Sequence, residues 1–146
     1  MKKKLLLSLV FLFMFSCFLV GCGKKNEQNK KEEKVVCENN IYDNYYKYTY
    51  TYIDNKITFI EEHDEIIYDE ALYGEFESTK SDIIDTFENL GGTTVSVELV
   101  DNKIIVDLNS KVEDINKSLV NDQSLYEKTP DELIKHYELQ GFTCKK

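Results

Sequence analysis

The chain has 146 residues, of which 27 are acidic and 18 are basic, giving a formal net charge of −9 at pH 7. Every basic residue is Lys, so the sequence has no guanidinium group for bidentate binding of phosphate or carboxylate. Because nucleic-acid binding needs clustered basic side chains, this acidic balance argues against a nucleic-acid partner.

The first 21 residues have the parts of an export signal. Lysines at positions 2–4 give a positive start, and residues 5–20 form an apolar run that is shorter than the roughly 18 or more residues of a membrane span. Small Gly21 then precedes Cys22. We therefore predict a removable signal peptide over residues 1–21, rather than a transmembrane helix that is retained.

The segment Leu19-Val20-Gly21-Cys22 resembles the lipobox of bacterial lipoproteins. The resemblance implies that a signal peptidase cleaves between Gly21 and Cys22 and that the Cys22 thiol carries diacylglycerol. Two acyl chains, such as palmitate, hold a protein durably on a membrane, whereas one chain binds only marginally. We therefore expect the mature protein on the extracytoplasmic face of the cell membrane.

The residues that follow Cys22 are expected to form a tether. Residues 23–34 have no apolar side chain to bury, so the composition cannot offset the entropy of ordering. We predict a flexible charged tether over residues 22–34 and one folded domain over residues 35–146. The tether is net basic and the domain strongly acidic, so an anionic membrane surface attracts the first and repels the second.

Two of the four cysteines remain for the folded domain. Cys17 leaves with the signal peptide and Cys22 is consumed by lipid, which leaves Cys37 and Cys144 near the two ends of the domain. In an exported protein an isolated pair of this kind predicts a disulfide. Two free thiols are the alternative.

A short repeat organises the middle of the chain. Residues 53–57 (Ile-Asp-Asn-Lys-Ile) recur as residues 100–104 (Val-Asp-Asn-Lys-Ile), and Asp-Asn suits the positive φ angles of a type I′ hairpin turn. With 101–102 as a two-residue loop, one face of the second hairpin is aliphatic. Its expected cross-strand pairs are Leu99–Ile104, Val97–Val106 and Val95–Leu108.

The same register in the first hairpin gathers tyrosines on one face. It pairs Tyr52 with Ile57, Tyr50 with Phe59 and Tyr48 with Glu61. Either these rings pack the margin of the core, or they form a ligand surface with an exposed rim. The candidate surface comprises Tyr46, Tyr48, Tyr50, Tyr52 and Glu61.

Helical patterns follow each hairpin. Apolar residues recur at helical spacing over residues 72–90, with a break expected near Gly74 and an end at Gly91-Gly92. Capping-box patterns predict further helices, over 112–120 after Ser110-x-x-Glu113 and over 130–140 after Thr129-Pro130-Asp131-Glu132. Residues 142–144 are expected to return as a short strand.

This order predicts an α+β domain built from a doubled β-β-α unit, an antiparallel sheet with helices packed on one face. The tether, Val35-Val36-Cys37 at the start and residues 141–145 (Gly-Phe-Thr-Cys-Lys) at the end resemble small YehR-like lipoproteins of the kind found in Gram-positive bacteria. The resemblance implies export and this fold, but no particular activity.

The sequence has little that points to catalysis. It has no Gly-x-Ser-x-Gly elbow, no His-Glu-x-x-His pair and no glycine-rich phosphate loop, and His136 is expected on a helix surface. The run Glu61-Glu62-His63-Asp64-Glu65 offers metal-ligand types, but neighbouring strand residues point to opposite faces. We therefore predict no metal site, no cofactor and a solvated acidic stretch.

Two functional hypotheses remain. The first is a lipid-anchored, non-enzymatic binding module with a protein, peptide or glycan partner, and the aromatic, acidic hairpin favours a cationic or peptide-like ligand. The second is a small cell-envelope enzyme that uses carboxylates such as Glu61 and Asp64 as acid and base. A shallow tyrosine surface would favour the first, and a deep pocket with two converging carboxylates the second.

Overall fold

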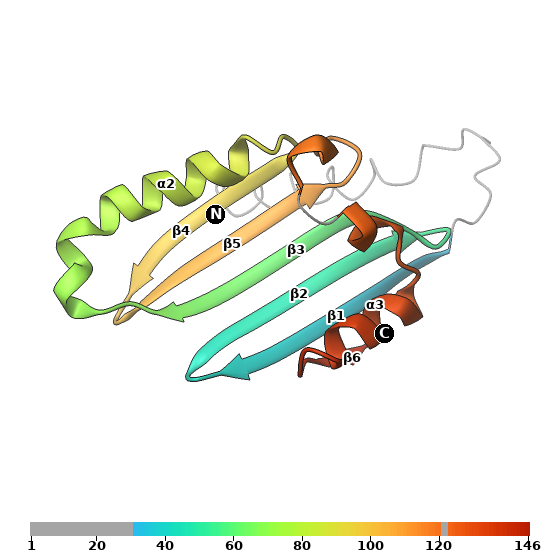
Figure 1. The fold of residues 1–146 in the computed structure, drawn as a ribbon, viewed down its shortest axis with the longest axis horizontal. Helices are drawn as coiled ribbons and strands as arrows, with labels where there is room; N and C mark the ends of the chain where they lie inside the picture. Colours follow the sequence, from blue (N-terminus) through green and yellow to red (C-terminus); the bar gives the residue numbers. More distant parts are fainter. Residues whose placement is uncertain (1–30, 121–122) are drawn as a thin grey trace, which may run out of the picture.

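The computed structural model describes residues 31–120 and 123–146. The predicted signal peptide, with Gly21 and Cys22, lies outside these ranges. The described chain forms a mixed α+β domain with a six-stranded antiparallel sheet and helices (Figure 1). No helix in these ranges has the length and apolar character needed to span a membrane.

The sheet has the strand order β4-β5-β3-β2-β1-β6. Three consecutive strands form a meander at its centre, the β4–β5 hairpin joins it beside β3, and short β6 joins it beside β1. The strands are β1 (Glu32–Ile41), β2 (Asn44–Ile53), β3 (Lys56–Ile67), β4 (Thr93–Val100), β5 (Lys103–Lys111) and β6 (Thr143–Lys145).

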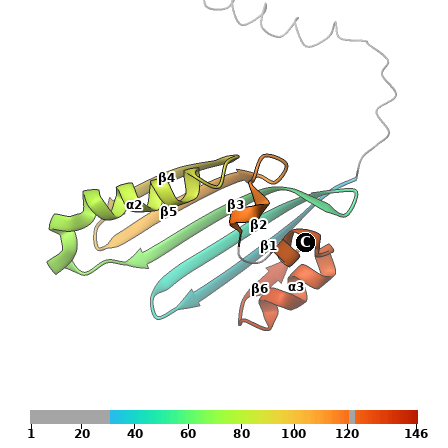
Figure 2. The ribbon, with the colours of Figure 1, turned by 45° about the horizontal axis from the view of Figure 1, so that its top comes forward.

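The α-helices α2 and α3 lie over the same face of the sheet, at opposite edges (Figure 2). Glu62 of β3 is paired with Tyr48 of β2 on one side and with Leu108 of β5 on the other. Because paired residues share a face, the residues under α3 and those under α2 belong to one side of the sheet. The helices are η1 (Glu70–Glu75), α2 (Phe76–Glu88), η2 (Lys117–Leu119), η3 (Gln123–Glu127) and α3 (Pro130–Glu138).

Two apolar clusters fill the space between this face and the helices. Under α2, the aliphatic side chains of the β4–β5 hairpin pack against Phe76, Ile83, Ile84 and Phe87. Under α3, Leu133 and Tyr137 pack against residues of the meander. The buried members of that second cluster are Val35, Cys37, Tyr50, Tyr52, Ile57, Ile60, Val112, Leu133 and Tyr137.

The first strand is longer than the sequence suggested and begins inside the predicted tether. β1 starts at Glu32, three positions before Val35, and pairs with β2 from Glu32 to Ile41. Residues 32–34 join the sheet through main-chain hydrogen bonds, which need no apolar side chain. Residues 32–34, which the sequence placed in the tether, therefore belong to the sheet.

The first hairpin turn has both positive φ angles that the Asp-Asn pattern predicted, whereas the second has one, at Asp101 and not at Asn102. Asp54, Asn55 and Asp101 have φ angles of 51°, 63° and 54°, and the β4–β5 register agrees with all three expected pairs. The β1–β2 turn was not anticipated, because Tyr42 and Asp43 adopt φ angles of 50° and 68° without a glycine or asparagine.

The helix predicted over residues 112–120 is absent. β5 continues to Lys111, and Ser110 pairs with Thr93 and Ile60 in the sheet instead of capping a helix. The Ser110 hydroxyl lies 2.9 Å from Thr93 Oγ1, and the amide of Val112 donates to the carbonyl of Thr58. Sheet pairing thus uses the groups that the capping box would have used, and residues 117–119 form one 3-10 turn.

The other helix signals agree with the structure. The expected break near Gly74 is the junction between the 3-10 helix η1 and α2. At α3, the Thr129 hydroxyl accepts from the Glu132 amide while the Glu132 carboxylate accepts from the Thr129 amide, which is a complete capping box with Pro130 as the first helical residue.

The doubled β-β-α unit is not confirmed. Three strands precede α2, because β1 joins the first hairpin, and the second hairpin is followed by 3-10 turns before α3 and β6. The coarser expectation of an antiparallel sheet with helices agrees with the structure.

Candidate functional site

A β-bulge in the first hairpin decides which side chains face the helices. Tyr52 pairs with Ile57 as the turn predicted, but Thr51 pairs with Phe59, so Thr58 is an extra residue on β3. The Thr58 hydroxyl donates to the carbonyl of Thr51 at 3.2 Å. Every pair beyond this point is displaced by one residue relative to the prediction.

Because of this displacement, Glu62 and not Glu61 lies opposite Tyr48. Tyr48 lies opposite Glu62, and Tyr46 opposite Asp64, so both carboxylates share the tyrosine face. Glu61 lies opposite Thr49 on the other face of the sheet, which α2 and α3 do not cover and which we call the helix-free face. The predicted pairing of Tyr48 with Glu61 is therefore wrong, and Glu61 does not belong to the candidate ligand surface.

The four tyrosines of the candidate surface, all on β2, divide into two pairs. Tyr50 and Tyr52 are each 1% exposed and belong to the core, as the packing interpretation expected. Tyr46 and Tyr48 are half-buried and line an open groove of about 410 Å³ beside α3. We call this the tyrosine groove, and its lining residues are Ile41, Tyr46, Tyr48, Tyr50, Glu62, Leu125, His136, Tyr137, Gln140 and Phe142.

Aromatic packing makes one wall of the tyrosine groove. The ring centroids of Tyr48, Tyr137 and Phe142 are separated pairwise by 5.1 to 5.5 Å. Beneath them, the hydroxyl of Tyr50 is hydrogen-bonded to that of Tyr137. Such contacts contribute about 0.5–1.5 kcal/mol per ring pair beyond the burial of apolar area, so this wall is well ordered.

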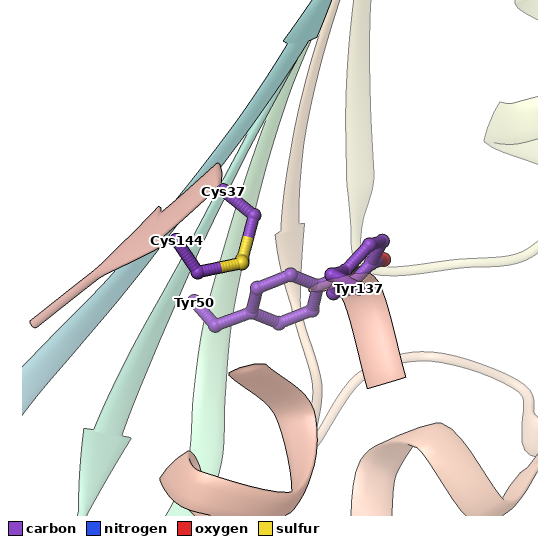
Figure 3. Close-up of a disulfide and its surroundings, with 4 residues drawn as sticks. All are labelled: Cys37, Tyr50, Tyr137 and Cys144. Carbon is purple, nitrogen blue, oxygen red and sulfur yellow. Dashed lines mark hydrogen bonds between the residues drawn. A yellow bond between two sulfur atoms is a disulfide. The ribbon is translucent and has the colours of Figure 1, made fainter. Parts of the chain in front are cut away.

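The disulfide predicted between Cys37 and Cys144 is present next to this wall (Figure 3). The two cysteines are paired directly across β1 and β6, with 4.1 Å between their Cα atoms. Figure 3 shows the ring of Tyr50 extending from beside the disulfide to Tyr137. The bond therefore holds the segment that includes Phe142 against the sheet.

The two carboxylates on this face have raised pKa values. Burial, and then the charge of Asp64, raise the pKa of Glu62 from 4.5 to about 7. Burial is also the largest cause at Asp64, whose pKa rises to about 6 although nearby His63 acts to lower it. The ion pairs within the described ranges include neither residue, and Oδ1 of Asp64 is enclosed without a hydrogen-bond partner.

The phenols of Tyr48 and Tyr137 stay neutral at physiological pH. Burial raises the pKa of Tyr48 well above 10, with further contributions from Asp64 and Glu62. Burial likewise raises the pKa of Tyr137 to about 12. The hydroxyl groups therefore act as hydrogen-bond donors and acceptors, and the negative charge of the site lies on the carboxylates.

The helix-free face has a separate polar network. Nδ1 of His63 lies 2.7 Å from Oδ1 of Asp107, its Nε2 lies 3.5 Å from Oε1 of Glu65, and Lys103 Nζ is 2.9 Å from the second oxygen of Glu65. Hydrogen bonds to these carboxylates raise the pKa of His63 although burial acts against them. Here the carboxylates are paired with His63 and Lys103, whereas Glu62 and Asp64 form no ion pair in the described ranges.

The acidic run at residues 61–65 is therefore split between two faces. Glu61, His63 and Glu65 lie on the helix-free face, and Glu62 and Asp64 lie under the helices. Within the described ranges, no three or more His, Cys, Asp or Glu side chains are grouped to hold a metal ion.

Sequence reasoning missed several groove residues. The bulge at Thr58 places Glu62 in the groove, and the hairpin sequence has no evident signal for a bulge. His136, expected on a helix surface, lines the tyrosine groove together with Gln140, and Nε2 of His136 lies 2.9 Å from Nε2 of Gln140. These residues come from α3 and its end, and only the packing of α3 on the sheet brings them to β2.

The sequence matches no protein-family model and no curated protein sequence. Two solved structures are similar to it in fold. The NMR structure of the E. coli YehR protein has a TM-score of 0.66 at 14% identity, over 80% of this chain and 93% of that one. The NMR structure of a protein from Streptococcus pneumoniae TIGR4 has a TM-score of 0.58 at 12% identity, over 86% and 92% of the two chains. At such low identity the likeness concerns the fold alone, and the chain has a YehR-like fold.

Proposed function

We propose that the protein is a membrane-anchored, extracytoplasmic lipoprotein that acts as a small non-enzymatic binding or interaction module, with the tyrosine groove as its ligand site. The observation that carries this proposal is the composition of the groove. Half-buried rings of Tyr46 and Tyr48 stand beside the carboxylate of Glu62 in an open hollow. Ligand sites are typically concave and aromatic, with a few polar groups that orient the ligand.

The lipobox-like segment at residues 19–22 supports anchoring through a diacylglyceryl group on Cys22. The chain enters the sheet at Glu32, and β1 runs from there to Ile41, which lines the tyrosine groove. A strand of ten residues is about 33 Å long. The groove extends along β1 away from Glu32, and an anchor on the Glu32 side would leave it open to a protein, peptide or glycan partner.

An enzyme that uses paired carboxylates is the second candidate. Glu61 and Asp64 lie on opposite faces, so this pair does not act on one substrate. Glu62 and Asp64 share a face, and their raised pKa values of about 7 and about 6 suit general acid–base chemistry. Of the two, only Glu62 lines the open groove, so a binding role has the stronger support.

The binding role is tested by affinity capture with matched tyrosine variants. The full-length lipidated protein, extracted in a non-ionic detergent, is the bait for cell-envelope extract. Tyr46→Ala removes a ring from the tyrosine groove, and Tyr45→Ala removes the neighbouring ring of the same strand from the opposite face. We expect one partner that Tyr45→Ala retains and Tyr46→Ala loses, and equal recovery by both variants would contradict the proposal.

The enzyme hypothesis predicts a different result in the same experiment. If Glu62 and Asp64 perform chemistry, Glu62→Gln and Asp64→Asn would retain the partner as an unconverted substrate and would accumulate it relative to the unsubstituted protein. A binding module makes no product, so mass spectrometry of the captured molecule should find it chemically unchanged with every variant.

A further inference from the structure

The Glu62 carboxylate lines the tyrosine groove and has no side-chain ion pair within the described ranges, and Asp64 lies beside it on the same face of the sheet. Glu62 and Asp64 lie two residues apart on the same face of β3, and neither forms an ion pair with a side chain in the described ranges. Oδ1 of Asp64 is enclosed and has no hydrogen-bond donor. Keeping a carboxylate from water without a partner costs free energy, and Glu62, which lines the groove and has no ion pair in the described ranges, is the carboxylate that a cation in the groove can pair with.

The walls of the groove indicate which kind of cation fits. Tyr48 and Glu62 are paired across β2 and β3 and both line the groove, and Tyr137 and Phe142 continue the aromatic wall. A ring face attracts an ammonium ion because the face of the aromatic ring is electrically negative. No group of three metal ligands exists in the described part of the chain, so an organic cation fits this site better than a metal ion.

Resting on the proposed function, we propose that the ligand group bound in the tyrosine groove is an organic ammonium ion, held between the Glu62 carboxylate and the tyrosine rings. A primary amine also has N–H donors for the phenol oxygens of the wall. The hollow of about 410 Å³ is near the lower end of the range for small-ligand sites, and it has room for an ammonium group with several methylene groups.

Binding of the ammonium ion is coupled to release of a proton from Glu62. In the free protein, burial and Asp64 keep the pKa of Glu62 at about 7, so below neutral pH the carboxyl O–H is intact. The ammonium ion pairs with the carboxylate, so the proton leaves to water as the cation binds. The other titratable groups near the site are Tyr46, Tyr48 and Tyr50 on β2, Asp64 on β3, His136 and Tyr137 on α3 and Tyr126 on η3.

The experiment follows tyrosine ring signals by NMR in the full-length protein. The chain is labelled on its tyrosine rings and kept in a non-ionic detergent, because choline headgroups are themselves organic cations. The probes are n-butylammonium, the neutral 1-butanol, and a blocked Gly-Lys-Gly peptide, at constant ionic strength. Rings of Tyr46 and Tyr48 report on the groove, and the ring of Tyr45 reports on the opposite face.

We expect n-butylammonium to shift the groove signals at pH 8, with an affinity about a hundredfold weaker at pH 5, since only the ionised fraction of Glu62 binds. 1-Butanol should have little effect. Glu62→Gln, which removes an unpaired charge and so should fold well, should remove the preference for the cation. Glu61→Gln, whose side chain lies on the opposite face of the same strand, should keep the pH dependence.

If the peptide binds more tightly than n-butylammonium, the source of the cation is a lysine side chain. If the two bind equally, the source is a free amine. Equal shifts with 1-butanol and n-butylammonium would overturn the cation proposal while leaving the groove as a ligand site. A pH dependence that survives in Glu62→Gln would also overturn it. If no probe shifts the ring signals of Tyr46 and Tyr48, the proposal that the groove binds an ammonium ion is refuted. The capture experiment with Tyr46→Ala would still decide the binding role.

Discussion

Tyr48 of β2 lies directly opposite Glu62 of β3, and this pair joins the aromatic wall of the tyrosine groove to its uncompensated charge. The pairing follows from one extra residue, Thr58, in the preceding bulge. A regular hairpin with the same turn would have brought Glu61 to this position. A local irregularity thus selects which carboxylate is held away from water, and with it the electrostatic character of the site.

The charge of Glu62 should lower the stability of the protein at neutral pH. The pKa of Glu62 rises from 4.5 to about 7 on folding, so the folded chain binds this proton more tightly than the unfolded chain. The free energy of unfolding should therefore fall as pH rises from about 4.5 to about 7, and Asp64 acts in the same direction.

Glu62→Gln should raise the free energy of unfolding by about 2 to 3 kcal/mol at pH 8 and change it little at pH 4, as measured by denaturant unfolding. Glu61→Gln is the matched control, because its side chain lies on the helix-free face of the same strand. If Glu62→Gln stabilises the protein equally at both pH values, the effect does not come from burial of the Glu62 charge.

The Cys37–Cys144 bond should contribute a large part of the stability. It closes a loop across 107 positions, for which the chain-entropy model gives about 4 to 5 kcal/mol. Replacement of both cysteines by Ala should lower the free energy of unfolding by up to this amount and should broaden the NMR signals of Phe142 and Tyr137. Alkylation of two thiols without reductant would show that the bond is not formed.

The hydrogen bond between Tyr50 and Tyr137 should appear as a coupling energy. Tyr50→Phe and Tyr137→Phe each leave the other hydroxyl without its partner, so each should lower stability by about 1 to 2 kcal/mol. The double variant should cost about 1 kcal/mol less than the two single effects added together, because no unpaired hydroxyl remains. Strict additivity would mean that the two hydroxyls do not interact.

The capping box at Thr129 should stabilise α3 and, through it, one wall of the groove. Thr129→Ala removes the side-chain acceptor for the Glu132 amide and should cost about 1 kcal/mol. Thr129→Ser keeps the acceptor and should behave like the unsubstituted protein. If thermal unfolding shows equal losses for the two variants, the effect comes from the methyl group of Thr129 and not from the cap.

Local patterns in the sequence determined the parts of the fold that depend on neighbours along the chain. The Asp-Asn turns, the β4–β5 register and the capping box of α3 each involve groups within a few residues, and all three agree with the structure. The Cys37–Cys144 bond was also predictable, since two cysteines remain once the signal peptide and lipid account for the others. The predicted lipid at Cys22 stays a prediction.

Tertiary structure decided the parts in which distant segments compete for the same groups. Ser110 has the sequence of a helix cap, yet its partners in β3 and β4 keep it in the sheet. The bulge at Thr58 moved Glu62 to the helix-covered face, and the packing of α3 brought His136 beside β2. Sequence spacing alone determines that neighbouring strand residues face opposite sides, but pairing and packing determine which side is covered, and therefore which carboxylates remain without a counter-ion.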